Sequence, residues 1–171
     1  VRRLALILRN MPELIAEKGS VPKGWKGPWF ENTALILKIH FPGKSDSTFQ
    51  CFASSENAAR SFTADLLIFD EWAFQQFARS IWTAAFPVIN RHQSGQVIGL
   101  STIERGSLFE ELFGTPENGF YKIFIPWYAD PSRDKKWYED TRKALGDGIQ
   151  AEYPATIDEA LTVPGGAFFP E

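Results

Sequence analysis

The chain has few of the residues that build covalent or metal-bound cross-links. Its 171 residues include one cysteine, Cys51, and two histidines, His40 and His92. A single cysteine excludes an internal disulfide and a cysteine-based zinc site. Each histidine stands alone, which favours a core or surface role over metal binding. With 44% hydrophobic residues, the chain can bury a sizeable core instead.

Long apolar runs and targeting segments are also missing from the sequence. No run approaches the length of a membrane-spanning helix, and no signal peptide is recognisable. These absences favour a cytoplasmic protein without a membrane partner. No repeat, linker-like or low-complexity stretch divides the chain, so residues 1–171 are interpreted as one domain.

The chain carries no excess of positive charge. Its net charge of -3 argues against gripping DNA by bulk electrostatics. Lys23, Lys26, Lys135 and Lys136 could line a surface that contacts a nucleic-acid backbone, although such small clusters are usually solvated faces. Aromatic residues do not interleave with a basic stripe, which favours core packing over base stacking.

The most informative feature present is an apolar run, residues 64–69, that ends in Asp70 and Glu71. Such a run predicts a buried parallel strand, whose ligands lie at its C-terminal end. Successive strand residues point to opposite faces, so the two carboxylates should differ in role. One can hold Mg²⁺ while the other orients and deprotonates a water molecule. The alternative is a polar strand end whose acidic residues cap the following helix.

A second apolar strand is expected over residues 96–100, ending in the hydroxyl pair Ser101 and Thr102. Between the strands, residues 74–86 have apolar side chains at helical spacing, and Pro87 is expected to end that helix. This is a βαβ unit. Its right-handed crossover would bring both hydroxyls beside the two carboxylates on one rim of the sheet.

Hydroxyls at that rim can contact the γ-phosphate or the catalytic water. When that group leaves, the loss of the contact can move the next segment of the chain. The simpler alternative is that the pair only caps a following helix, here expected over residues 107–113.

The remaining pattern predicts an α/β sandwich. Residues 3–18 have helical spacing, with a break or the start of a second helix at Pro12, and a hairpin should join strands 34–41 and 48–53. Strands near Asp65, Gln96 and Phe120 should form the sheet, with helices near Phe74 and Asp134 packed on it.

Several stretches together resemble the ATPase domain of the large terminase subunit, the DNA-packaging motor of tailed bacteriophages. The resemblance runs over residues 4–169 and is most specific around Asp70. Leu161 stands where the family usually has phenylalanine. The stretches that carry the resemblance are residues 51–61 before a Walker B segment at 65–71, a coupling motif at 100–109, and the domain end at 124–131, 150–154 and 158–161.

The resemblance implies a role for each site residue. Asp70 would be the magnesium-site carboxylate, and Glu71 would activate water for attack on the γ-phosphate of ATP. Ser101 and Thr102 would couple hydrolysis to movement against DNA. Arg60 matches the family's arginine before Walker B and is a candidate phosphate-facing or subunit-facing cation, although Ser61 replaces the expected glycine. The alternative for Arg60 is a surface salt bridge.

The largest departure from the family is the absence of a glycine-rich phosphate loop ending in Lys-Ser or Lys-Thr. Residues 21–29 contain glycine and lysine but also two prolines, and they read as a surface loop. The expected fold is therefore an incomplete P-loop NTPase-like domain of the ASCE type, three-layered α/β/α, without its Walker A strand and loop. An unpaired sheet edge should result.

The resemblance also implies the setting of the complete protein. It would hydrolyse ATP with Mg²⁺ to drive double-stranded DNA into a capsid in the host cytoplasm, as a homo-oligomer with a small terminase subunit and the capsid portal. The chain reads as truncated at both ends, lacks the family's nuclease domain and should be inactive alone. The alternatives are a fragment of a superfamily-2 helicase or a non-catalytic module that binds DNA or a portal.

Overall fold

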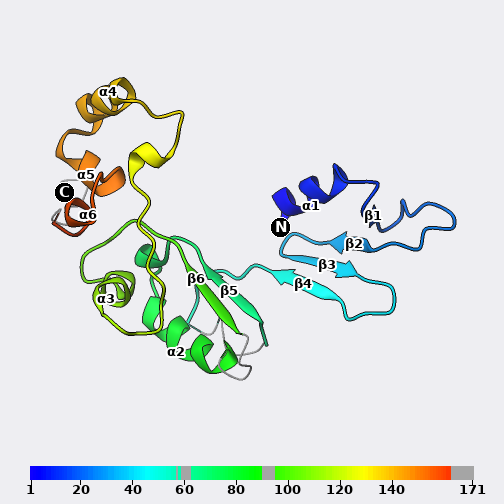
Figure 1. Ribbon diagram of the computed structural model, residues 1–171. Coiled ribbons are helices and arrows are strands. Elements are labelled where there is room, and N and C mark those ends of the chain that lie inside the picture. Colours follow the sequence, from blue (N-terminus) through cyan, green and yellow to red (C-terminus); the bar gives the residue numbers. More distant parts are fainter. Residues whose placement is uncertain (57, 59–62, 90–94, 163–171) are drawn as a thin grey trace. The chain divides into compact units, whose positions relative to one another are not determined.

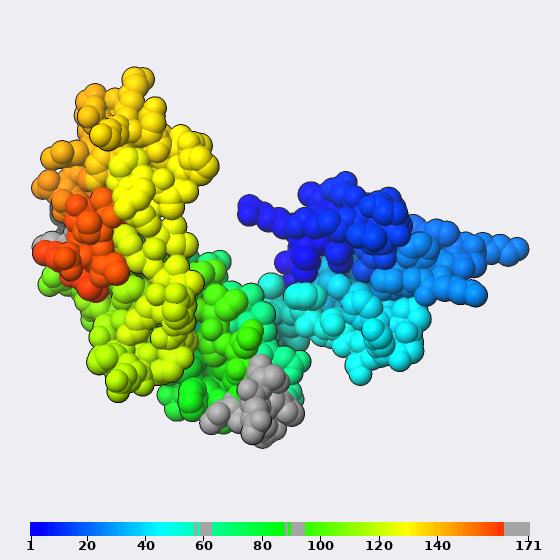
Figure 2. Space-filling model, viewed as in Figure 1, coloured from blue at the N-terminus to red at the C-terminus, as the bar shows by residue number. Residues whose placement is uncertain are grey.

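A computed structural model describes residues 1–56, 58, 63–89 and 95–162 of the chain (Figure 1). The chain forms two compact units, residues 1–53 and residues 54–171. In the space-filling view the first unit is blue to cyan, and the second runs from green to red (Figure 2). No helix within the described ranges has both the length and the apolar character needed to cross a membrane.

The first unit is a four-stranded sheet with one helix, α1 (Arg2–Arg9). The predicted hairpin is confirmed, because β3 and β4 pair antiparallel. β2 also pairs antiparallel with β3, and the short β1 lies parallel to β2 at the edge. The strands of this sheet are β1 (Ala16–Glu17), β2 (Trp29–Asn32), β3 (Ile36–His40) and β4 (Ser47–Gln50).

The core of the first unit lies between α1 and the sheet. Ala5, Phe30 and Leu37 are fully buried there, and Ile15 joins them. The predicted break near Pro12 is confirmed, since α1 ends at Arg9, but the prediction of helix after it is wrong, because β1 occupies residues 16 and 17. Proline cannot donate the backbone hydrogen bond that a helix interior needs, and residues 10–14 therefore form turns around position 12.

The second unit contains the predicted βαβ arrangement. β5 (Leu66–Phe69) and β6 (Gln96–Gly99) are parallel and adjacent, and α2 (Ala78–Ile89) connects them along the chain. The helix begins later than predicted because a 3₁₀ turn, η1 (Trp72–Phe74), and the extended Gln75 precede it. Pro87 does not end it, since α2 continues for two more residues.

The core of the second unit is largely aromatic and aliphatic. Its buried members are Phe69, Trp72, Ala78, Ile81, Ala85 and Leu108. α3 (Leu108–Gly114) follows β6 and begins as predicted, with the Ser107 hydroxyl accepting a hydrogen bond from the Glu110 N–H at 3.1 Å. This helix and η1 are neighbours around the core.

The strand predicted near Phe120 is absent, and this expectation is wrong. Within the described part of the chain, residues 121–125 make no backbone hydrogen bonds, and β6 pairs only with β5. Phe120 nevertheless packs on the core, while Tyr121, Ile123 and Ile125 are exposed at alternating positions. A strand-like sequence without a neighbouring strand therefore stays irregular.

The last third of the second unit is helical. α4 (Lys135–Leu145) was expected to pack on the sheet, but its main neighbours are η3 (Gly146–Gly148) and α5 (Ile149–Glu152). η2 (Trp127–Ala129) and α6 (Ile157–Thr162) complete this region. Trp127 stacks on Tyr138 of α4 with ring centroids 4.5 Å apart, so aromatic contacts hold α4 against η2.

Candidate active site

The two parallel strands of the second unit end side by side. Phe69 of β5 pairs with Gly99 of β6, and the Leu100 N–H donates a 2.9 Å hydrogen bond to the Phe69 carbonyl. Asp70 and Glu71 follow one strand, and Ser101 follows the other. The parallel pairing thus places these polar residues at the same rim of the sheet, where open parallel sheets bind their ligands.

Two further hydrogen bonds join the turn after β5 to the end of β6. The Trp72 N–H donates to the Leu100 carbonyl at 3.0 Å. The Ala73 N–H donates to the Ser101 hydroxyl oxygen at 3.1 Å. The Ser101 side chain therefore holds the turn that carries the carboxylates and does not cap α3, whose N-cap is Ser107.

The backbone of Glu71 adopts an uncommon conformation. Its φ of 49° and ψ of 46° lie in the left-handed region, which a residue with a Cβ atom enters at a cost. The strand has already ended at Phe69, so a turn, and not strand alternation, sets the direction of Glu71. Asp70 and Glu71 are both exposed, and the Asp70 carbonyl accepts a 3.0 Å hydrogen bond from the Gln75 amide.

The buried side chain of Trp72 anchors the turn that follows β5. It is 1% exposed and stacks on Phe69, with ring centroids 4.5 Å apart and planes inclined by 13°. A Cβ atom at Gly99 would lie 2.4 Å from the Trp72 ring, so only glycine fits there. Sequence reasoning missed both residues, although a glycine closing an apolar strand was a usable signal of close approach.

The metal-binding capacity of the rim is limited to a small donor set. No group of three or more His, Cys, Asp or Glu side chains within the described ranges can hold a metal ion. Mg²⁺ in nucleotide sites takes one or two protein carboxylates, with substrate phosphates and water as the other ligands. Asp70, exposed at a strand end, fits that donor set.

The remaining candidates from the sequence are Thr102, Arg60 and the two histidines. Thr102 is half-buried, and its hydroxyl has no hydrogen-bond partner among the residues that the structure describes. Arg60 and His92 lie outside the described residues. His40, in the first unit, stacks on Trp29 with ring centroids 3.8 Å apart. Its Nε2 lies 3.2 Å from a carboxylate oxygen of Glu31.

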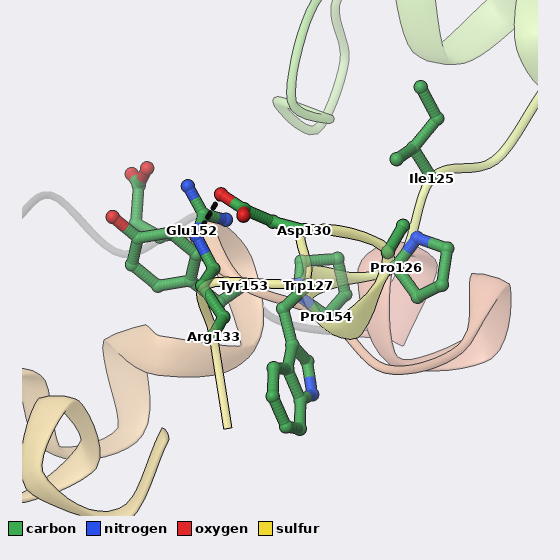
Figure 3. A pocket seen from close by; sticks show the side chains of 9 residues that line it. Ile125, Pro126, Trp127, Asp130, Arg133, Glu152, Tyr153 and Pro154 are labelled. Carbon is green, nitrogen blue, oxygen red and sulfur yellow. Dashed lines mark ion pairs between the residues drawn. The ribbon is translucent and has the colours of Figure 1, made fainter. Parts of the chain in front are cut away.

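A separate pocket of about 320 Å³ lies in the C-terminal part of the second unit (Figure 3). Arg133 contacts Asp130 there at 3.3 Å and lies over the rings of Trp137 and Tyr153, 5.0 and 5.1 Å from their centroids. Hydrogen bonds from the Ser132 hydroxyl and N–H, together with the Arg133 charge, hold the pKa of Asp130 below its usual value. Asp130 and Arg133 of this pocket thus neutralise each other.

Comparison with known proteins relates this geometry to a fold. No protein-family model and no curated protein sequence matches the chain significantly. The large terminase ATPase domain of Thermus phage P74-26 matches its structure with a TM-score of 0.58 and 24% identity, over 76% of this chain and 63% of that domain. The fold is that of a phage large terminase ATPase domain.

An arginine-to-alanine variant of the same phage domain gives a TM-score of 0.64 and 20% identity, over 90% of this chain and 69% of that domain. These structural matches establish the terminase ATPase fold. At such low identity they do not establish the chemistry, which is argued from the site. The predicted mixed α/β architecture with a parallel pair is confirmed at this level. The chain spans about two thirds of the domains that it matches.

Proposed function

We propose that the chain is part of the ATPase domain of a phage large terminase. In the complete protein, the polar residues at the strand ends of its second unit would catalyse ATP hydrolysis. One observation carries the proposal. The turn with Asp70 and Glu71 at the C-terminal end of β5 is hydrogen-bonded to Ser101 at the end of β6. The terminase-like fold supports the same reading.

The roles of the residues follow from their chemistry. Glu71 is the general base, because its exposed carboxylate can accept the proton of a water molecule that attacks the γ-phosphate. Asp70 would hold the Mg²⁺ that enters with ATP, which neutralises charge on the transferred phosphoryl group.

Ser101 transmits the state of the site. Its hydroxyl receives the Ala73 N–H from the same turn, so a shift of that turn pulls on the end of β6. Thr102 continues the chain from there and is the second coupling residue. Arg60 is kept as a candidate phosphate-facing or subunit-facing cation.

A working site needs a phosphate-binding loop that these 171 residues do not contain. We propose that a strand bearing this loop, from outside these 171 residues, pairs with the sheet. We also propose that the chain alone does not turn over ATP. Among the described residues β6 pairs only with β5, so its other edge offers a place for such a strand. The complete motor would then act on double-stranded DNA as a homo-oligomer, with a small terminase subunit and a capsid portal as partners.

The test is ATP turnover by a protein extended at its N-terminus through a phosphate loop. We expect Glu71→Gln to abolish turnover while nucleotide binding persists, and Asp70→Asn to remove its magnesium dependence together with most of its rate. Glu117→Gln is the matched control. Glu117 is also exposed, and at φ 54° it is the other non-glycine residue with positive φ among the described residues.

Unchanged turnover in Glu71→Gln would remove Glu71 from the mechanism. Absence of turnover in every extended protein would favour a non-catalytic module that binds DNA or a portal. Duplex-unwinding activity in an extended protein would favour the superfamily-2 helicase.

A further inference from the structure

The net charge of -3 conceals opposite charges on the two units. Residues 1–53 contain eight lysines and arginines against four aspartates and glutamates. Residues 54–171 contain ten against seventeen. The first unit is therefore a basic body within an acidic chain, and the overall charge is a poor guide to what it binds.

Most carboxylates of the first unit are already neutralised. Glu17 accepts a 2.8 Å hydrogen bond from Arg9, Glu31 pairs with Lys18, and Asp46 lies 3.3 Å from Lys38. Five cations have no carboxylate partner within residues 1–53, all of which the structure describes. These cations are Arg2, Arg3, Lys23, Lys26 and Lys44.

Strand register gathers three of the unpaired cations at one end of the sheet. Trp29, the first residue of β2, pairs with His40, the last residue of β3. The loop before β2 and the loop after β3 therefore leave the sheet at the same end, as Figure 1 shows. Lys23 and Lys26 lie in the first loop and Lys44 in the second, and all three are exposed. We call these three residues the lysine surface.

Both loops are held in defined turns. The Trp25 N–H donates to the Pro22 carbonyl at 3.0 Å, and the Lys44 N–H donates to the Phe41 carbonyl at 3.1 Å. Gly43, at φ 71°, supplies the left-handed conformation of the second turn. The exposed lysines are thus carried on loops whose backbones are hydrogen-bonded.

The two tryptophans near these loops are already engaged. The Trp25 indole N–H donates to the Pro28 carbonyl at 2.9 Å, and its ring covers Gly27 so closely that a Cβ there would lie 2.6 Å away. Trp29 stacks on His40. Neither ring is presented as a free platform for an unstacked base, which is the main device of single-strand binding.

From these observations we infer that the lysine surface binds the phosphate backbone of duplex DNA, without reading its sequence. Lysine is a compact point charge on a flexible stem, suited to phosphates whose exact positions vary. The inference deepens the proposed motor function and rests on it for the choice of DNA as the polyanion. It does not depend on ATP hydrolysis, because the lysine surface lies wholly in the first unit.

The experiment is fluorescence anisotropy of a labelled DNA duplex titrated with the 171-residue chain, without nucleotide, at several salt concentrations. The test variant combines Lys23→Gln, Lys26→Gln and Lys44→Gln. The control combines Lys135→Gln, Lys136→Gln and Lys143→Gln, which removes the same charge from α4. Far-UV circular dichroism and thermal unfolding check that both variants fold.

Each phosphate contact contributes about -0.9 to the slope of log K against log salt. The test variant should therefore lose about three units of slope, while the control keeps the slope of the unaltered chain. Raising salt from about 50 to about 200 mM should then weaken the unaltered chain about forty-fold more than the test variant. Two duplexes of unrelated sequence should bind equally.

Equal losses in the test and control variants would overturn the inference, since net charge alone would then explain binding. Tighter binding of a single strand, of anionic lipid vesicles or of polyglutamate would overturn it by identifying another ligand. If the triple variant unfolds, the three single variants replace it, each with an expected loss of about one unit of slope. Because binding is measured without nucleotide and the three lysines lie in the first unit, the outcome is independent of the test of hydrolysis.

Discussion

The two units organise their strands in opposite ways. The first is antiparallel apart from its two-residue β1, and local turns join its main strands. The second has a parallel pair whose strands are brought together by a helix and by contacts far apart in sequence. A local turn closes an antiparallel hairpin, whereas a parallel pair needs a long crossover between strands that are far apart in sequence. The comparison can be tested by changing one contact at a time.

The largest effect should come from Gly99→Ala, because the new Cβ would lie 2.4 Å from the Trp72 ring. We expect about 2 kcal/mol of destabilisation, confined to the second unit. Urea unfolding followed by hydrogen exchange of each unit measures it. The control is Gly114→Ala, where a Cβ meets no atom within 4 Å and the change should be neutral or stabilising. Equal losses in both variants, or loss of the first unit as well, would contradict this account.

The next effect concerns the hydrogen bond between strand ends. Ser101→Ala leaves the Ala73 N–H without its acceptor, which should cost about 1.5 kcal/mol and increase exchange of that amide. Thr102→Val removes a hydroxyl that has no partner among the described residues, so its unfolding free energy should be nearly unchanged. If Thr102→Val were the more damaging change, the second hydroxyl, and not the first, would hold the turn.

Glu71→Gly should stabilise the second unit by about 1 kcal/mol, since glycine enters the left-handed region freely. Part of the relieved strain is offset by the greater freedom of glycine in the unfolded chain. Thermal unfolding of the 171-residue chain measures the gain. Glu117→Gly should give a similar gain, so only turnover by the extended protein would distinguish the two positions. A loss of stability at Glu71 would show that its side chain makes a favourable contact.

The smallest effect is the acid response of the first unit. Hydrogen bonds from Lys18 and His40 lower the pKa of Glu31, and Arg9 lowers the pKa of Glu17. Groups with lowered pKa stabilise the fold fully above about pH 4.5, and this stability is lost as pH falls through their folded pKa. Glu31→Gln should flatten the decline of the melting temperature below pH 4.5, and Glu13→Gln should not. Identical acid profiles would show that the pairs contribute nothing.

Local signals in the sequence were enough for several elements. The turn residues between β3 and β4 predicted the hairpin, and Ser107 predicted the start of α3. The apolar runs that became β5 and β6 predicted a parallel pair, and therefore that Asp70 and Ser101 follow neighbouring strand ends. Each of these depends on neighbours within a few residues or on the fixed hand of a crossover.

Other features could not be predicted because their causes lie elsewhere in the fold. The left-handed Glu71 follows from the burial of Trp72 against Gly99, which periodicity does not reveal. The late start of α2 has the same origin, since η1 must first place Trp72 in the core. Residues 121–125 have a strand-like pattern, but among the described residues they make no backbone hydrogen bonds to another strand.

The single cysteine gives the chain a built-in point of attachment. Cys51 is exposed, while its backbone N–H is tied to the Leu35 carbonyl at 2.9 Å, two residues before the boundary of the first unit. A maleimide dye would therefore label each molecule once, at a rigid position beside the junction. Such a label would need no engineered residue.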